Sequence, residues 1–369
     1  MCILLQKRKL SHVDVCLSKP VEFKDKSTCF EDVHLVHNSL PEFNLGDVDL
    51  GVDFLGHRFG APIIISAMTG GSEVSYKINR VLGIAAERLG LGMGVGSQRI
   101  ALEKLDVSYT FSVVREVAPD IFLMGNLGAA QFSLGYGLAE ALKAVEMVDA
   151  DALAVHLNAL QEAVQSEGEP HYGGVLAKIE DLCSSLSVPV VVKETGAGIS
   201  GDVASLLKDA GVSAIDVGGA GGTSWAAVEY YRSLESGDLL HSHLAESFWD
   251  WGIPTSICIS EVRSAVDLPI IATGGVRSGL DAVKALALGA DVVGLALPLL
   301  RPAFEEGVEG VLSYLTSFIE ELRVAMFLVG ARTVADLSSV PLVVTGFMGS
   351  WMRLRGLVPE ALARRGKKF

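Results

Sequence analysis

Short hydrophobic runs recur along the chain from about residue 61, and each ends in glycine or polar residues before an amphipathic stretch begins. The runs are rich in Val, Ile and Leu and mostly do not alternate with polar residues, which is typical of parallel strands covered on both faces. We predict eight strands, at residues 62–66, 91–95, 121–125, 152–156, 188–193, 214–217, 269–273 and 291–295.

Helical patterns separate these runs, for example at residues 76–89, 138–148, 203–210 and 280–288. In the last of them, the apolar positions 280, 283, 286 and 287 fall on one helical face. Eight strand–helix units in succession favour an α/β fold that closes as a (β/α)8 TIM barrel, with an open doubly wound sheet as the alternative. A barrel predicts that the chemistry lies at the C-terminal ends of its strands.

The connection after the sixth strand is long, at about fifty residues, where a strand–helix unit normally needs far fewer. Three of the four tryptophans, Trp225, Trp249 and Trp251, lie in it. We expect this aromatic insertion, residues 224–254, to form a lid over the barrel, or else a packing surface between subunits.

The first 60 residues do not show this recurring pattern of apolar runs and amphipathic stretches, and we predict an irregular arm before the barrel. Arg8, Lys9 and His12 form a basic group in it, for which composition alone favours a solvated, mobile terminus. His34 and His37 have no third ligand at a useful spacing, so a turn before Leu40 and Pro41 is expected rather than a metal site.

Polar residues follow nearly every predicted strand. The glycine-rich stretch from Thr273 to Gly279 predicts a phosphate site, because glycines let backbone N–H groups approach an anion at a helix N-terminus. Arg277 adds a cation, while a plain turn with Ser278 as helix cap is the alternative. A second glycine cluster, residues 218–222, leads to Thr223 and is suited to the same phosphate.

Lys193 ends a very apolar strand, so its charge needs a partner. An anionic ligand or electron-rich ring, a Schiff-base reaction as in barrel aldolases, and pairing with Asp216 are the three interpretations. The fourth strand ends in a compact polar set, His156, Asn158, Gln161 and Glu162, of which Glu162 suits either a magnesium ion shared with a diphosphate or the positive end of a helix. Ser97, Gln98 and Arg99 add an anion-binding group after the second strand.

The amino-acid composition limits the class of protein to which the chain can belong. Half of the residues are hydrophobic and 20% are charged, which allows a large core. The net charge of −14 argues against a nucleic-acid partner. We expect no membrane span, because no apolar run reaches roughly 18 residues, and no signal peptide. Five scattered cysteines predict neither disulfides nor zinc, but a reduced, cytoplasmic protein.

The order of these motifs resembles the type 2, FMN-dependent isopentenyl-diphosphate isomerases. The resemblance rests on Arg-Lys-x-x-His at residues 8–12, Met-Thr-Gly-Gly at 68–71, Gly-Ser-Gln-Arg at 96–99, His-Leu-Asn-x-x-Gln-Glu at 156–162, Lys-Glu at 193–194 and Thr-Gly-Gly-Val-Arg at 273–277. It implies interconversion of isopentenyl and dimethylallyl diphosphates in isoprene biosynthesis, with reduced FMN as the acid and base. It also implies Mg²⁺, NADPH as the reductant, and a homo-tetramer or homo-octamer.

The resemblance also implies three parts and a set of site residues. The parts are an arm at residues 1–60 that contributes to the substrate site, the FMN-binding barrel at 61–330 and an extension at 331–369. The FMN residues would be Ala67, Met68, Thr69, Gly70, Ser97, Asn126, Lys193, Thr223, Gly274, Gly275, Val276, Arg277, Ala296 and Leu297. The substrate residues would be Arg8, Lys9, His12, Ser97, Gln98, Arg99, His156, Asn158 and Gln161, with Gln161, Lys193 and His156 catalytic and Glu162 the metal ligand.

Three other functions are alternatives to an isomerase. An FMN-dependent oxidoreductase needs a protein base, commonly a histidine near the seventh strand, yet no histidine follows Pro254. A barrel of the inosine-monophosphate-dehydrogenase type needs a nucleophilic cysteine after the sixth strand, where Cys258 falls in an apolar helical stretch. A structural or ligand-sensing barrel would not need so many polar strand ends.

Overall fold

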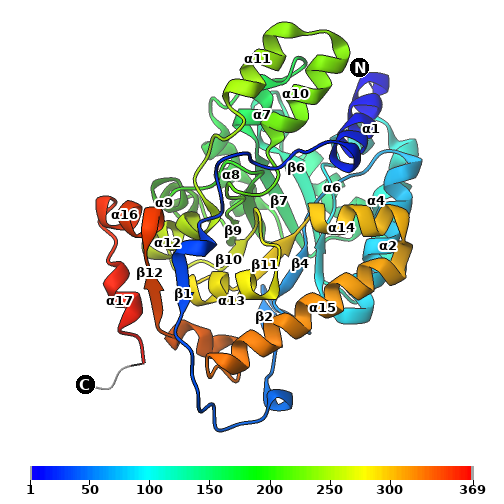
Figure 1. The fold of residues 1–369 in the computed structure, drawn as a ribbon. Helices are drawn as coiled ribbons and strands as arrows, with labels where there is room; N and C mark the ends of the chain where they lie inside the picture. Colours follow the sequence, from blue (N-terminus) through cyan, green and yellow to red (C-terminus); the bar gives the residue numbers. More distant parts are fainter. Residues whose placement is uncertain (1, 367–369) are drawn as a thin grey trace.

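The computed structural model describes residues 2–366, so residue 1 of the predicted arm and residues 367–369 of the predicted extension lie outside the described part. Eight parallel strands close into a barrel in the order β10-β11-β4-β5-β6-β7-β8-β9 (Figure 1). The strands are β4 (Ile63–Ile65), β5 (Gly92–Gly94), β6 (Leu123–Gly128), β7 (Ala152–Leu157), β8 (Val190–Glu194), β9 (Ala214–Asp216), β10 (Ile270–Ala272) and β11 (Val292–Leu295). The predicted TIM barrel and its eight strands are therefore confirmed, and the open sheet is excluded.

Helices surround the barrel (Figure 1), and their ends follow capping residues in the sequence. Ser72 caps α2 and Ser278 caps α13, each accepting a backbone N–H three residues on, and both helices end at a glycine with positive φ. The outer helices are α2 (Glu73–Leu89), α3 (Arg99–Glu103), α4 (Tyr109–Val117), α5 (Ala129–Ser133), α6 (Leu138–Val148), α7 (Ala159–Val164), α8 (Val175–Ser185), α9 (Gly201–Asp209), α12 (Thr255–Ala265), α13 (Gly279–Leu288), α14 (Leu297–Glu305) and α15 (Gly307–Leu328).

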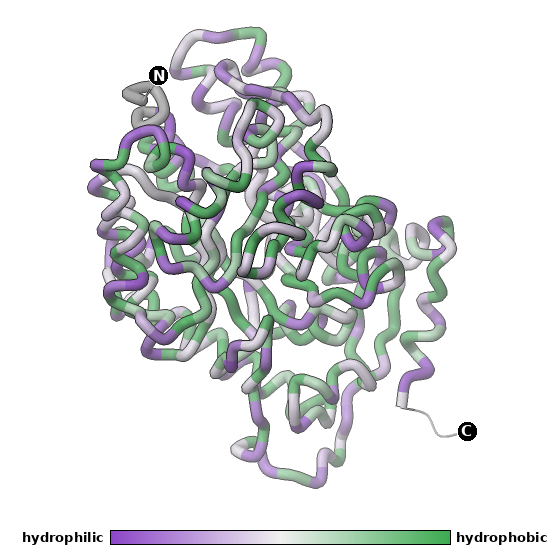
Figure 2. Tube along the Cα trace, turned by 180° about the vertical axis from the view of Figure 1, so that it is seen from behind, coloured by the Kyte–Doolittle hydropathy of each residue, from purple (hydrophilic) through white to green (hydrophobic). Residues whose placement is uncertain are grey.

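A β-hairpin covers the N-terminal end of the barrel. Its strands β2 (Val52–Phe54) and β3 (His57–Phe59) pair antiparallel around Leu55 and Gly56, both with positive φ, as a tight hairpin turn requires. Phe54 and Phe59 are buried against Phe122 and the first residues of several barrel strands. This end is therefore apolar and packed. In Figure 2 hydrophobic segments cross the centre of the molecule, while hydrophilic ones recur along the outer helices.

The long connection after β9 contains three helices, α10 (Trp225–Ser236), α11 (Leu239–Ser247) and the barrel helix α12. The pair α10–α11 stands above the C-terminal ends of the strands, beside the first helix (Figure 1). Trp249 is buried against Tyr230 and Tyr231 within this insertion. Its position over the barrel mouth is that expected of a lid.

The prediction of an irregular, solvated N-terminus was wrong. Residues Cys2–Ser18 form helix α1, which packs on α10, α3 and α14 and buries Val13 and Val15. The error arose because local sequence favours this helix weakly, so that tertiary packing decides its conformation. Val33–Leu35 form β1, which pairs with β12 (Leu342–Val344), and the chain then bends at Ser39, where a turn before Leu40 and Pro41 was expected.

The segment after α15 returns to the outside of the barrel. Helix α16 (Gly346–Leu354) packs on α12, and α17 (Pro359–Ala363) packs beside β12. Glu261 of α12 is buried and accepts hydrogen bonds from Trp351 (2.7 Å) and Arg355 (3.0 Å). This network attaches the C-terminal helices to the barrel wall.

Candidate active site

A cavity of about 240 Å³ opens at the C-terminal ends of the strands, under α1 and α10. It is lined by residues from the loops after the barrel strands and by Arg8, Lys9 and His12 of α1. Within the described chain, all predicted site residues line this cavity except Gly70, Gln98 and Val276. The structure thus brings together residues that are more than 280 positions apart in sequence.

Two glycine loops meet on one side of the cavity. A Cβ on Gly275, whose φ is +72°, would lie 2.7 Å from the carbonyl oxygen of Gly221, and one on Gly222 would collide with the backbone of Gly275. The loops therefore approach each other as closely as two backbones can. Within residues 2–366, no backbone hydrogen bond uses the N–H of Gly275 or Val276, just ahead of α13. These free donors match an anion site at a helix N-terminus.

Arg277 follows these donors but already has a partner. Its guanidinium pairs with Glu22 at 2.7 Å, and Glu22 belongs to the segment that connects α1 to the barrel. Ser278 caps α13, as the alternative interpretation of this loop expected. The turn, the cap and the free donors are therefore all present.

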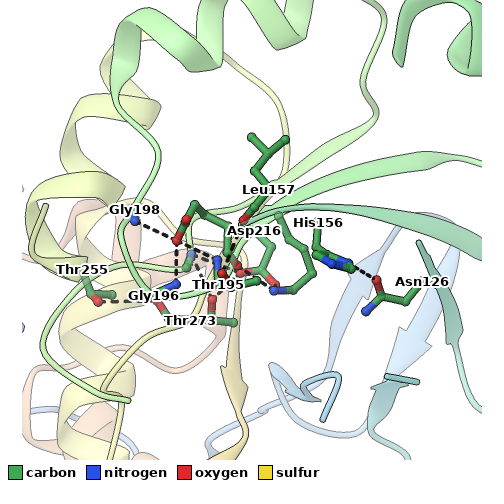
Figure 3. Close-up of polar contacts among 12 residues, drawn as sticks. Asn126, His156, Leu157, Thr195, Gly196, Gly198, Asp216, Thr255 and Thr273 are labelled. Carbon is green, nitrogen blue, oxygen red and sulfur yellow. Dashed lines mark hydrogen bonds and ion pairs between the residues drawn. The ribbon is translucent and has the colours of Figure 1, made fainter. Parts of the chain in front are cut away.

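Lys193 lies at the floor of the cavity, at the end of β8. Its ammonium donates to the carbonyl of Glu194 (2.6 Å) and lies 3.8 Å from Asp216, which is only 2% exposed. Asp216 also accepts hydrogen bonds from the Thr273 hydroxyl and from the N–H of Gly218 (Figure 3). Lys193 therefore pairs with Asp216 and also faces the cavity, so two of the interpretations of this residue hold together.

His156 at the end of β7 donates a hydrogen bond from its ring Nδ1–H to the side-chain amide oxygen of Asn126 of β6, at 2.7 Å (Figure 3). Burial, together with the positive charges of Lys193, Lys9 and Arg8, lowers the pKa of His156 to about 3. The ring is therefore neutral near pH 7 and offers one donor and one acceptor. It is suited to hydrogen bonding rather than to charge pairing.

Asn158, Gln161 and Glu162 form a chain along the start of α7. The Asn158 amide donates to Gln161 (3.2 Å) and to Glu162 (3.0 Å), and the other carboxylate oxygen of Glu162 accepts from the N–H of Glu169 (2.7 Å). Glu162 lies in the first turn of a helix, where a negative charge is stabilised. Among the described residues, no group of three or more His, Cys, Asp or Glu is arranged for a metal ion, so a metal there would need ligand oxygens from a substrate.

Helix α1 places three basic side chains at the cavity. The Lys9 ammonium donates to the carbonyl of Ser97 at 2.5 Å, and the buried Nε of Arg8 has no hydrogen-bond partner. Burial and then the charge of Arg8 lower the pKa of Lys9 to about 7. Arg8 and Lys9 are buried without a bonded carboxylate, which predicts that the ligand of this region is an anion.

Two predicted substrate residues have other partners. Gln98 is fully buried and donates to the carbonyl of Ala144 while its oxygen accepts from the N–H of Asn126, so its role is to support β6 behind the cavity. Arg99 lines the cavity but pairs with Glu103 (3.0 Å) and Glu169 (2.6 Å). Burial would lower its pKa, yet these two carboxylates raise it.

Glu229 of α10, which is 1% exposed, is a further residue of the site that was not predicted from the sequence. Its carboxylate lies 2.9 Å from His12, accepts from Gln161 at 3.1 Å and pairs with Arg232. Burial alone would raise its pKa, but His12, Arg232 and Gln161 lower it to about 2. Glu229 therefore joins α1, α7 and the insertion through one ionised group. The single signal for it was its place in the aromatic insertion, one turn after Trp225.

Glu194, next to Lys193, was also missed as a site residue. One oxygen of its buried carboxylate accepts the N–H groups of Thr195, Gly196, Ala197 and Gly198, as Figure 3 shows in part. It thereby fixes the loop after β8, from which Thr195 and Gly196 line the cavity.

The residues fit a cofactor that carries a phosphate and an electron-rich ring. Free N–H donors at the glycine loops suit the phosphate, and Lys193 supplies a cation at the floor for the ring. The Ser66 hydroxyl is buried at the cavity without a hydrogen-bond partner and offers a further polar contact.

Comparison with known proteins agrees with this chemistry. The sequence model of the family described as FMN-dependent dehydrogenase matches residues 130–343. Among solved structures, a mandelate oxidase variant (TM-score 0.64, 18% identity, 92% of this chain and 99% of that one) and a flavocytochrome b2 variant (TM-score 0.64, 19% identity, 89% and 81%) share the fold. Fold and site therefore define an FMN-dependent barrel protein.

Closer relatives identify the branch. Isopentenyl-diphosphate delta-isomerase of Thermococcus kodakarensis is 52% identical over 366 residues, covering 97% of this chain and 96% of the relative. That of Methanosarcina barkeri is 50% identical over 363 residues, covering 98% of each chain. The chain belongs to the isopentenyl-diphosphate delta-isomerase family. The oxidoreductases with the same fold are far more distant in sequence.

Proposed function

We propose that this enzyme interconverts isopentenyl and dimethylallyl diphosphates by a 1,3-allylic proton shift, with FMN as cofactor. The observation that carries the proposal is about 50% identity, over nearly the whole chain, to isomerases of this name. The buried cations of α1 over a flavin-type barrel support it, because a diphosphate carries more negative charge than the single carboxylate of a hydroxyacid and needs more cations to bind it.

We assign the glycine loops and Arg277 to the cofactor phosphate, and Lys193 to the ring. The other cofactor contacts would be those predicted from the strand-end loops, including Met68, Thr69 and Asn126. Reduced FMN, when bound, supplies the acid and base for the proton shift. Lys193 holds a positive charge at the cavity floor, and Asp216 keeps it in place.

Arg8, Lys9 and His12 would bind the diphosphate from above, and Arg99, His156 and Asn158 from the strand ends. Gln161, fixed between Asn158 and Glu229, would contact the reacting part of the substrate. The insertion excludes water from the cavity, which strengthens each of these charge interactions.

Magnesium, the reductant, the location and the assembly belong to the same proposal. Glu162 supplies one carboxylate, and Mg²⁺ would take its remaining ligands from the diphosphate and water. NADPH as reductant, a homo-tetramer or homo-octamer and a cytoplasmic location follow the resemblance. No helix among residues 2–366 is both long and apolar enough to cross a bilayer.

The test is proton NMR of isopentenyl diphosphate in deuterated buffer with the enzyme, FMN, dithionite and magnesium. We expect deuterated dimethylallyl diphosphate, and none when dithionite is omitted. An enzyme that binds FMN but leaves the substrate unchanged would instead be an FMN-dependent oxidoreductase, which is the alternative function on this barrel. A screen of substrates that reduce the flavin would then identify it.

A further inference from the structure

Asp216 is a buried carboxylate whose presence the barrel fold does not explain. It ends β9, where the register places it opposite Lys193 of β8 and Ile271 of β10. A barrel core is built mainly of apolar side chains, and an unpaired buried carboxylate is strongly destabilising. The charge of Asp216 therefore needs partner groups at the floor of the cavity.

The contacts of Asp216 show which groups are its partners. One carboxylate oxygen faces the Lys193 ammonium at 3.8 Å, and the other accepts from the Thr273 hydroxyl and from the N–H of Gly218. Thr273 and Gly218 begin the two glycine loops, so Asp216 links the cation of the floor to both of them. Lys193 has a second support, the carbonyl of Glu194 at 2.6 Å.

No other carboxylate among the described residues forms an ion pair with Lys193. Glu194 is adjacent, but its carboxylate is turned to four backbone N–H groups of its own loop. His156 lies opposite Lys193 in the register of β7 and β8, and burial together with the charges of Lys193, Lys9 and Arg8 keeps it neutral. Burial also raises the pKa of Asp216, while Lys193 and Thr273 oppose this effect.

We propose that Asp216 is a positioning residue that holds Lys193 toward the cavity and, through its negative charge, sets the reduction potential of the bound flavin. The proposal rests on the proposed FMN site but not on the identity of the substrate. A carboxylate beside Lys193 offsets part of the positive charge that favours an electron-rich ring. Without it, the floor favours the reduced ring over the oxidised ring more strongly.

The experiment measures the midpoint potential of bound FMN in the wild-type enzyme and in Asp216→Asn, which retains the shape and removes the charge. We expect the affinity for reduced FMN relative to oxidised FMN to rise about tenfold, which raises a two-electron potential by about 30 mV. Lys193→Gln removes the opposite charge and should lower the potential. A merely structural role would leave the potential unchanged.

Glu261→Gln is the matched control, because Glu261 is equally buried but pairs with Arg355 outside the cavity. It should lower the melting temperature without changing the midpoint potential of the flavin.

An Asp216→Asn enzyme with an unchanged or lower potential overturns the proposal. If that variant does not fold, the double variant Lys193→Gln/Asp216→Asn, which removes both charges, is compared with Lys193→Gln. A higher potential in the double variant supports the role, and equal potentials overturn it. Failure of the wild type to bind FMN would instead count against the proposed function.

Discussion

Lys9 is a buried amine whose charge depends on its surroundings. Its ammonium contacts the carbonyl of Ser97 and lies 5.0 Å from the centre of the Phe111 ring, beside the cation Arg8. With its pKa lowered to about 7, Lys9 is largely uncharged in the free enzyme above neutral pH. An anion bound beside it would raise that pKa again, so we expect binding of a diphosphate at this helix to be coupled to proton uptake.

This coupling predicts the pH dependence of substrate affinity. Below about pH 7 Lys9 already carries its proton, and KM for isopentenyl diphosphate should be lowest. As the pH rises above 7, binding must take up a proton and KM should increase, up to about tenfold per unit. The measurement is KM between pH 6 and 9.

Lys9→Arg provides the control, because arginine remains charged over this range. Its profile should be flatter than that of the wild type at high pH. Parallel profiles for the two enzymes would show that another group controls the pH dependence.

Helix α10 of the insertion contacts residues of α1 and α7 at the cavity. Its Glu229 binds His12 of α1 and Gln161 of α7, and its Trp225 packs edge-on against His12, with ring centres 5.2 Å apart. A second contact joins the same elements, since Arg232 pairs with Glu167 beyond α7. The three elements therefore share one network, and α10 carries its central charge.

We expect Glu229→Gln to lower kcat by up to about 100-fold, because a small displacement of Gln161 and His12 is enough to misalign the substrate. The amide retains the size of the carboxylate but no longer pairs with His12 and Arg232. FMN binding should be unaffected, because Glu229 is not among the residues that line the cavity. The measurement is steady-state kinetics together with the flavin spectrum.

Glu235→Gln, on the exposed side of the same helix, is the control and should behave as the wild type. A Glu229→Gln enzyme with unchanged kcat and KM would show that α10 only covers the cavity.

At the scale of the whole molecule, the barrel is closed by different chemistry at its two ends. The mouth carries buried charges, and the opposite end is filled by the β2–β3 hairpin, where Phe54 contacts Phe59 and Phe122. The polar end contributes the site and the apolar end contributes stability, which is the usual division in this fold.

Phe54→Ala should therefore reduce the free energy of unfolding by about 3–5 kcal/mol while the kinetic constants remain near those of the wild type. Phe54 is 2% exposed, so its removal leaves a cavity under the strands. Urea denaturation measures the loss. Leu105→Ala, at a side chain 72% exposed, should change the stability by less than about 0.5 kcal/mol. Equal losses in the two variants would contradict the role of the hairpin.

The hydrophobic pattern of the chain is enough to predict the barrel and the end of the barrel at which the candidate site lies. Eight apolar runs separated by amphipathic stretches define parallel strands, and parallel strands present their C-terminal ends at one edge. The polar residues that follow them, from Met68 to Arg277, must then meet there. Strand position and side-chain direction are local properties of the chain, so they are visible in its pattern.

How the C-terminal end of the barrel is covered depends on contacts between segments that are distant in sequence. Cys2–Ser18 is a helix because α10, α3 and α14 cover it, and a short isolated helix of this kind is marginal in water. Glu229 and His12 are 217 positions apart, and the pairing that buries both follows no sequence period. The same holds for Arg277 with Glu22, whereas Lys193 and Asp216 end neighbouring strands, so that their pairing was one of the interpretations of the sequence. Such charges become partners only when the folded chain removes water from between them.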